Sequence, residues 1–109
     1  MVECAMDTDA LIKDINSTLK SRFRDYTGVY FFGSRARGDY GKYSDYDMVF
    51  VFGTEPDWRK KDQVREFVYW KEMEYDLVID GKYYSQEDVE HYKTPFLESV
   101  FKKGKFYAV

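Results

Sequence analysis

The stretch GSRARGDYGKYSDYD, residues 33–47, decides how the fold and the function of this chain are interpreted. It begins with a Gly-Ser turn that carries two arginines, and it ends with Asp45 and Asp47 on either side of one residue. Glycine at position 33 allows a sharp turn and lets an anion approach the backbone. The stretch is therefore either an ordinary polar loop or a phosphate-binding turn beside a pair of metal-binding carboxylates.

Apolar runs flank this stretch on both sides. Residues 29–32 (VYFF) predict a buried strand, and residues 45–52 (DYDMVFVF) predict a second strand that starts polar and ends apolar. Between them we expect a short helix over residues 34–38, whose free N–H groups would point at an anion. Because alternate side chains of a strand share a face, Asp45 and Asp47 should lie side by side. Oxygen ligands suit Mg²⁺, although a bare pair of acids also fits a solvated strand start.

The rest of the chain predicts helices and two further strands. Helical spacing and capping residues predict helices over residues 9–24, 58–73, 85–92 and 95–103. Residues 74–79 (EYDLVI) and 82–84 predict strands that a turn at Asp80-Gly81 would join. We therefore expect an α/β or α+β fold, with a mixed sheet of about four strands and helices mainly on one face.

A third acid would complete a two-metal site. Asp76 is the preferred candidate, because it lies inside a predicted strand and is followed by apolar residues. Glu74 and Asp80 would share its face in an ideal strand and are the alternatives. A salt bridge from Asp76 to Arg37 or Lys71 would explain the acid equally well.

The composition limits the classes of function. A length of 109 residues and 44% hydrophobic residues indicate one globular domain over residues 1–109. A net charge of −3 argues against a nucleic-acid partner, which would require an extended basic surface. With one cysteine, Cys4, and one histidine, His91, disulfides and Cys-cluster zinc sites are excluded. The chain shows neither a secretory signal nor an apolar run that could span a membrane, so we expect a cytoplasmic protein.

The motifs together resemble those of the minimal nucleotidyltransferase family, the small branch of the DNA polymerase beta-like nucleotidyltransferase superfamily. The composite pattern is G-S-x-A-R-G at residues 33–38, then S-D-x-D at residues 44–47, with a later strand acid at Asp76. This composite is far more selective than either half, and the predicted elements over residues 9–79 fit the family's core. The resemblance implies the nucleotidyltransferase fold.

The resemblance also implies a reaction and its residues. It implies Mg²⁺-dependent transfer of a nucleoside monophosphate, AMP from ATP, to a hydroxyl group, with pyrophosphate released. Arg35 falls at a variable position of the motif and receives no role. The residues that match the family's motif are the catalytic, Mg²⁺-binding acids Asp45, Asp47 and Asp76, which would hold two ions, and the nucleotide-binding Gly33, Ser34 and Arg37.

The same resemblance implies a partner protein. Members of the family pair with HEPN-domain proteins as antitoxins, and some transfer AMP to a tyrosine of that partner. Only about 30 residues follow Asp76, too few for a second domain that closes over an acceptor. Tyr40 and Tyr43 could stack on a base or contact the partner. The alternative is a weakly catalytic or non-catalytic module that neutralises its partner by association, and a homo-oligomer is compatible with either function.

Overall fold

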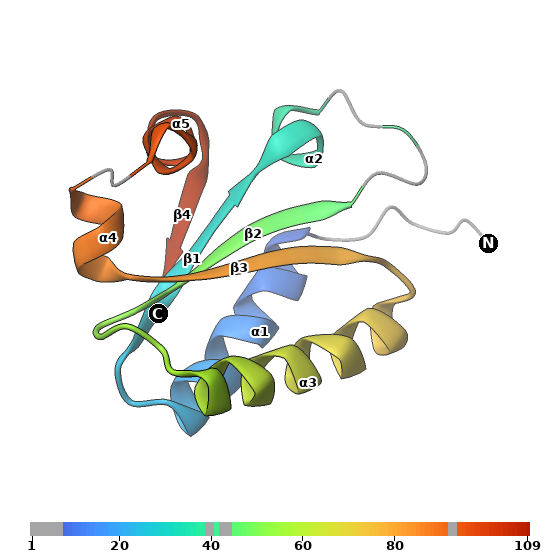
Figure 1. Cartoon of the computed structure of the whole chain (residues 1–109). Helices are drawn as coiled ribbons and strands as arrows, with labels where there is room; N and C mark the ends of the chain where they lie inside the picture. The colour runs from blue at the N-terminus through green and yellow to red at the C-terminus, as the bar shows by residue number, and fades with distance from the viewer. Residues whose placement is uncertain (1–7, 39–40, 42–44, 92–93) are drawn as a thin grey trace.

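The computed structural model of the chain describes residues 8–38, 41, 45–91 and 94–109 (Figure 1). One mixed sheet organises the fold, with strand order β3-β2-β1-β4. β1 runs antiparallel to β2 and β4, whereas β2 and β3 are parallel. The α+β class and the four-stranded mixed sheet predicted from the sequence are therefore confirmed. The strands are β1 (Tyr26–Phe32), β2 (Tyr46–Phe52), β3 (Ile79–Ser85) and β4 (Lys105–Ala108).

Helices lie on both sides of this sheet (Figure 1). The two long helices, α1 (Thr8–Arg22) and α3 (Trp58–Tyr75), pack on one side, which we call the α1/α3 face. The short α4 (Gln86–Glu90) and α5 (Pro95–Lys103) pack on the other, the α4/α5 face. The remaining helix, α2 (Gly33–Arg37), follows β1 directly. Within the described residues, no helix is both long and apolar enough to cross a bilayer.

Strand alternation in β2 assigns side chains to the two faces. Its even-numbered residues, such as Met48 and Phe50, are buried in the core under α1 and α3. Val49 and Val51 instead belong to the smaller core under α4 and α5. Asp47 has the same parity as these valines, so its carboxylate is on the α4/α5 face.

The third strand differs from the sequence-based prediction. α3 continues to Tyr75, and Asp76 caps it in the left-handed conformation, with φ 57° and its N–H donating to the Glu72 carbonyl. The Asp80-Gly81 pair lies inside β3 rather than in a hairpin turn. The predicted strand over residues 74–79 and the predicted hairpin are therefore wrong. Helix-forming residues extend α3 until an aspartate, which tolerates the left-handed conformation, ends it.

The fourth strand is also different from the one expected. It is formed by the chain's last residues, which pair with β1 after α5 ends at Gly104. A buried hydrogen-bond chain holds this end in place: the Tyr26 hydroxyl donates to Asn16, and the Asn16 amide donates to the Tyr107 carbonyl at 3.0 Å. The sequence of the four residues in β4 does not indicate that they pair with β1, because the partner strand lies at the other end of the chain.

Candidate active site

The turn from β1 into α2 lies directly against an acid of β2. Gly33 has φ 83°, a conformation that side-chain-bearing residues rarely adopt. A Cβ added to Gly33 would lie 2.0 Å from Oδ2 of Asp47, so the carboxylate rests against the backbone of the turn. Both the conformation and the close approach require glycine here. The predicted phosphate-binding turn and one of the predicted metal-binding acids are thus adjacent in space.

A second carboxylate lies beside Asp47 in the sheet. Asp80 is its register partner across the parallel pair β2/β3. Neighbouring strands are about 4.8 Å apart, and register partners point to the same face. Asp80 has the parity of Tyr84, which packs in the α4/α5 core, so both carboxylates emerge on the α4/α5 face. On the other side of Asp47, its β1 partner is Phe32.

The two other predicted acids, Asp45 and Asp76, lie at different places in the fold. Asp45 is exposed and immediately precedes β2, two positions before Asp47, and the predicted side-by-side placement of the two carboxylates stays a prediction. Asp76 is exposed at the end of α3 and does not lie in a strand, so its predicted strand position is wrong. Asp80, the alternative in the sequence analysis, occupies the place beside Asp47. Asp80 becomes the register partner of Asp47 because α3 ends at Tyr75 and β3 therefore starts at Ile79. The alternation of residue types in the sequence did not indicate that helix end.

Lys82 contributes a positive charge to the same face. Its ammonium lies 3.4 Å and 3.5 Å from the two carboxylate oxygens of Asp80. The same ammonium lies 5.5 Å from the ring centroid of Phe96 at the start of α5. Because Lys82 follows Asp80 by two positions in a strand, the shared face is a consequence of alternation. Lys82 therefore balances part of the negative charge that Asp47 and Asp80 concentrate.

Arg35, to which sequence reasoning gave no role, links α2 to β2. Its guanidinium donates to the Tyr46 hydroxyl at 3.1 Å and lies 4.4 Å from the centroid of that ring. Tyr46 is buried on the α1/α3 face and stacks on Phe31, as expected for the residue between two outward-facing acids. This contact fixes the turn at Gly33 relative to the start of β2. The alternation around Tyr46 was the signal that could have indicated a partner for Arg35.

Comparisons with known proteins identify the family of the chain. The model of the nucleotidyltransferase domain family matches residues 12–105. The chain belongs to the nucleotidyltransferase domain family. It is 30% identical over 92 residues to "Putative protein adenylyltransferase MJ0141" of Methanocaldococcus jannaschii, covering 84% of this chain and 86% of that protein. A structure described as "Crystal structure of the toxin-antitoxin with AMP-PNP" shares the fold, with a TM-score of 0.65 at 17% identity over 90% of this chain and 70% of the other.

This membership confirms the predicted enzyme class, a nucleotidyltransferase (EC 2.7.7.-). Ser34 and Arg37 of the motif belong to α2, which starts at Gly33, while their side chains lie outside the described part of the structure. Tyr40 and Tyr43 also lie outside the described residues. The predictions for these side chains remain predictions.

The acids of this nucleotidyltransferase fit a magnesium site in their chemistry. Asp45, Asp47 and Asp80 offer only oxygen donors, which Mg²⁺ prefers, and the absence of a side chain at Gly33 makes room for the Asp47 carboxylate. Among the described residues, no three acidic, histidine or cysteine side chains converge into a ready-made cage. Mg²⁺ retains several waters and takes further ligands from substrate phosphates, so an open set of one or two carboxylates is sufficient.

Proposed function

We propose that this nucleotidyltransferase transfers AMP from ATP to a hydroxyl of a partner protein, a tyrosine of a HEPN-domain protein, and acts in the cytoplasm as an antitoxin. The observation that carries the proposal is the Asp47–Asp80 pair on one face of the sheet, against the turn at Gly33. The relative from Methanocaldococcus jannaschii carries the name of a protein adenylyltransferase, which supports a protein as acceptor. The structure with the same fold is described as a toxin–antitoxin, which makes such a partner the first to test.

The chemistry would proceed by in-line displacement at the α-phosphate. The acceptor oxygen forms a bond to that phosphorus, the bond to the bridging oxygen of the β-phosphate breaks, and pyrophosphate leaves. Two Mg²⁺ ions would neutralise charge on the phosphates. Asp45 and Asp47 would hold these ions. Asp80 takes the role first given to Asp76, and its carboxylate would accept the proton of the attacking hydroxyl.

The remaining motif residues would hold the nucleotide. Backbone N–H groups at the turn after Gly33, with Ser34, would face the β- and γ-phosphates. Arg37 would brace the triphosphate or the loop through its guanidinium, which suits phosphate oxygens. These positions follow from the motif, and the place of the turn beside Asp47 supports them.

Label transfer tests the proposal directly. The chain is incubated with Mg²⁺, ATP labelled at the α-phosphate and a HEPN-domain protein, and labelled protein is measured after denaturing electrophoresis. We expect a labelled partner with the unchanged chain and none with Asp47→Asn. Glu98→Gln on α5 is the matched control, since this exposed carboxylate pairs with Lys102 and not with a residue of the proposed site. Label that persists in Asp47→Asn would refute the assignment.

The binding-only alternative also has an observation in its favour. α3 exposes four large apolar side chains, each more than half exposed: Trp58, Tyr69, Trp70 and Met73. Exposed apolar groups of this kind are typical of surfaces that bind other proteins. Toxin neutralisation by a chain that carries both Asp45→Asn and Asp47→Asn would show that association, rather than transfer, is the operative function.

A further inference from the structure

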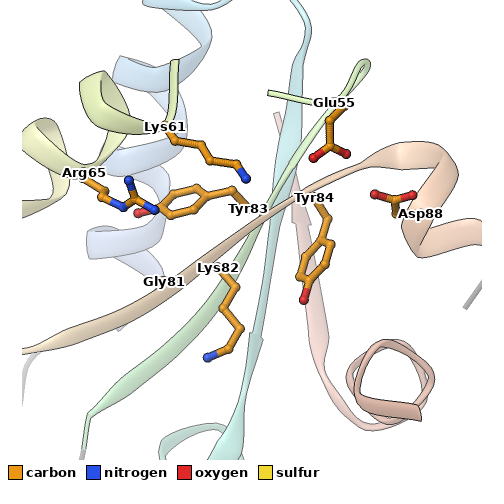
Figure 2. A pocket seen from close by; sticks show the side chains of 8 residues that line it. All are labelled: Glu55, Lys61, Arg65, Gly81, Lys82, Tyr83, Tyr84 and Asp88. Atoms are coloured by element: carbon orange, nitrogen blue, oxygen red, sulfur yellow. The ribbon is translucent and has the colours of Figure 1, made fainter. Parts of the chain in front are cut away.

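An open hollow of about 400 Å³ follows the outer side of β3 (Figure 2). Its walls come from the start of α3, from β3 itself, from the turn after β2 and from α4. β3 is the last strand in the order β3-β2-β1-β4, so the hollow lies at an edge of the sheet. The residues that line it are Glu55, Lys61, Arg65, Gly81, Lys82, Tyr83, Tyr84 and Asp88.

Hydrogen bonds show which backbone groups of this strand point outward. The Tyr46 amide donates to the Val78 carbonyl at 2.8 Å, so the even-numbered positions here direct their backbone toward β2. The next residue, Ile79, donates its N–H away from β2, to the Glu72 carboxylate at 2.7 Å. Because successive residues of a strand direct their backbone groups to opposite edges, odd-numbered residues of β3 face outward.

Two of these outward-facing residues, Gly81 and Tyr83, line the hollow. Their N–H and C=O groups form a short ladder along an edge that, within the described residues, has no further strand. An unpaired edge of this kind binds extended peptides by strand addition.

A segment added to this edge would pass the active site. It would lie about 4.8 Å from β3, so its side chain opposite Asp80 on the α4/α5 face would be the next neighbour of that carboxylate. Asp47 lies on the next strand, β2, directly opposite Asp80 and on the same face of the sheet. A hydroxyl carried at this position would therefore reach the acid that is proposed to accept its proton.

The charges around the hollow favour an acidic segment. The Arg65 guanidinium lies 5.4 Å from the Tyr83 ring centroid and makes an exposed ion pair with Asp62 at 3.3 Å. The Lys61 ammonium makes no hydrogen bond or ion pair with the described part of the chain. In Figure 2 these two cations gather around Tyr83, whereas Glu55 and Asp88 lie toward the other end of the strand. The cations therefore lie beside Tyr83, three residues along β3 from Asp80, although the whole chain has a net charge of −3.

We propose that the outer edge of β3 binds the protein acceptor as an added strand, with its hydroxyl-bearing residue opposite Asp80 and acidic residues beside it, against Lys61 and Arg65. The proposal rests on the proposed transfer to a protein and adds where that protein binds and which sequence it presents. The transferred group and the leaving group are those of the reaction above, and no further reactant is needed.

Peptide binding tests this surface without turnover. The probes are fluorescein-labelled peptides with the sequence Val-Tyr-Glu-Glu-Glu-Val and its reverse, each with a counterpart in which glutamine replaces every glutamate. Fluorescence anisotropy at low salt measures binding to the full chain. We expect one acidic peptide to bind about tenfold more tightly than its glutamine counterpart, and Lys61→Glu or Arg65→Glu to remove that preference. Arg59→Glu, at an exposed position of the same helix outside the hollow, is the matched control and should preserve it.

Two further readouts separate this proposal from the proposed function. Affinity for AMP-PNP should be the same in Lys61→Glu and the unchanged chain, whereas the KM for the peptide in AMP transfer should rise. A peptide that binds and responds to Lys61→Glu but is never labelled supports the docking surface and refutes transfer to protein. Absence of binding, equal affinity for the glutamine peptide, or an unchanged preference in Lys61→Glu would overturn the docking surface.

Discussion

The two faces of the sheet are built from the same strands, yet one is apolar throughout and the other begins with acids. On the α1/α3 face, Met48 and Phe50 of β2 are completely buried. On the α4/α5 face, Asp47 precedes Val49 and has Asp80 as its neighbour. Alternation along a strand therefore separates the residues that stabilise the fold from those that carry the chemistry. Substitutions on the two faces should consequently affect different measurements.

The largest expected effect is on the acidic face. Asp80→Asn should slow AMP transfer about a thousandfold, because loss of a metal-binding carboxylate removes several kcal/mol of stabilisation from the transition state. Asp76→Asn should leave the rate nearly unchanged, since asparagine also tolerates the left-handed helix end. Initial rates of label transfer measure both, and urea unfolding checks that both variants are folded. The opposite ranking would return the third acid to Asp76.

A substitution on the apolar face should instead affect stability. Phe50→Ala should lower the free energy of unfolding by about 3–5 kcal/mol, because the ring is fully buried and stacks on Tyr83 at 5.7 Å. Phe50→Leu should cost less than about 1.5 kcal/mol. Urea unfolding measures both losses. Transfer rates per folded molecule should be preserved, and a rate loss larger than the loss of folded protein would contradict the separation of the two faces.

Gly33 and Gly38 form a matched pair at the edge of the acidic face. Both have positive φ, 83° and 89°, but a Cβ at Gly33 would strike Asp47, whereas a Cβ at Gly38 would meet none of the described residues within 4 Å. Each alanine substitution should cost about 1–3 kcal/mol of backbone strain. Only Gly33→Ala should also abolish transfer, because it displaces the Asp47 carboxylate. Equal transfer rates in the two variants would show that the close approach is not needed for activity.

The smallest effect concerns a pair that joins α1 to α3. A hydrogen bond from Lys71, 2.6 Å away, holds the pKa of Asp14 below its usual value, with a second bond from Tyr75. A lowered folded-state pKa contributes stability above the unfolded value of about 3.9, and this is lost as the pH falls through the folded-state pKa. Asp14→Asn should therefore cost less than about 1 kcal/mol at neutral pH, since solvent screens the partly exposed pair.

The pH dependence provides the check on that assignment. Urea unfolding between pH 2 and 7, a range that spans the ordinary aspartate pKa, should show a shallower acid-side decline in Asp14→Asn than in the unchanged chain. Lys71→Met should make the decline shallower as well, because it removes the main donor to Asp14. Identical slopes in all three chains would mean that the pair contributes nothing to acid stability.

The sequence predicted the first half of the molecule better than the second. Apolar runs predicted the strand that ends before Gly33 and the strand predicted from Asp45. The glycines between these strands predicted the turns on either side of the short helix. The third strand was misplaced, because the end of α3 depends on a left-handed Asp76 and alternation over EYDLVI also fits a strand. β4 was missed because its pairing with β1 joins residues from opposite ends of the chain.

The sequence by itself determined the enzyme family and the glycine turn, and it predicted a pair at Asp45 and Asp47, because these are short-range patterns that depend on spacing along the chain. Only the tertiary structure decided which acid stands beside Asp47. That choice depends on the register between two strands, and register is set by where an intervening helix ends and by which side chains the two faces must bury. The tertiary structure also decided which edge of β3 is unpaired among the described residues, because β2 pairs with the opposite edge of that strand. The cations Lys61 and Arg65 line the hollow along the unpaired edge.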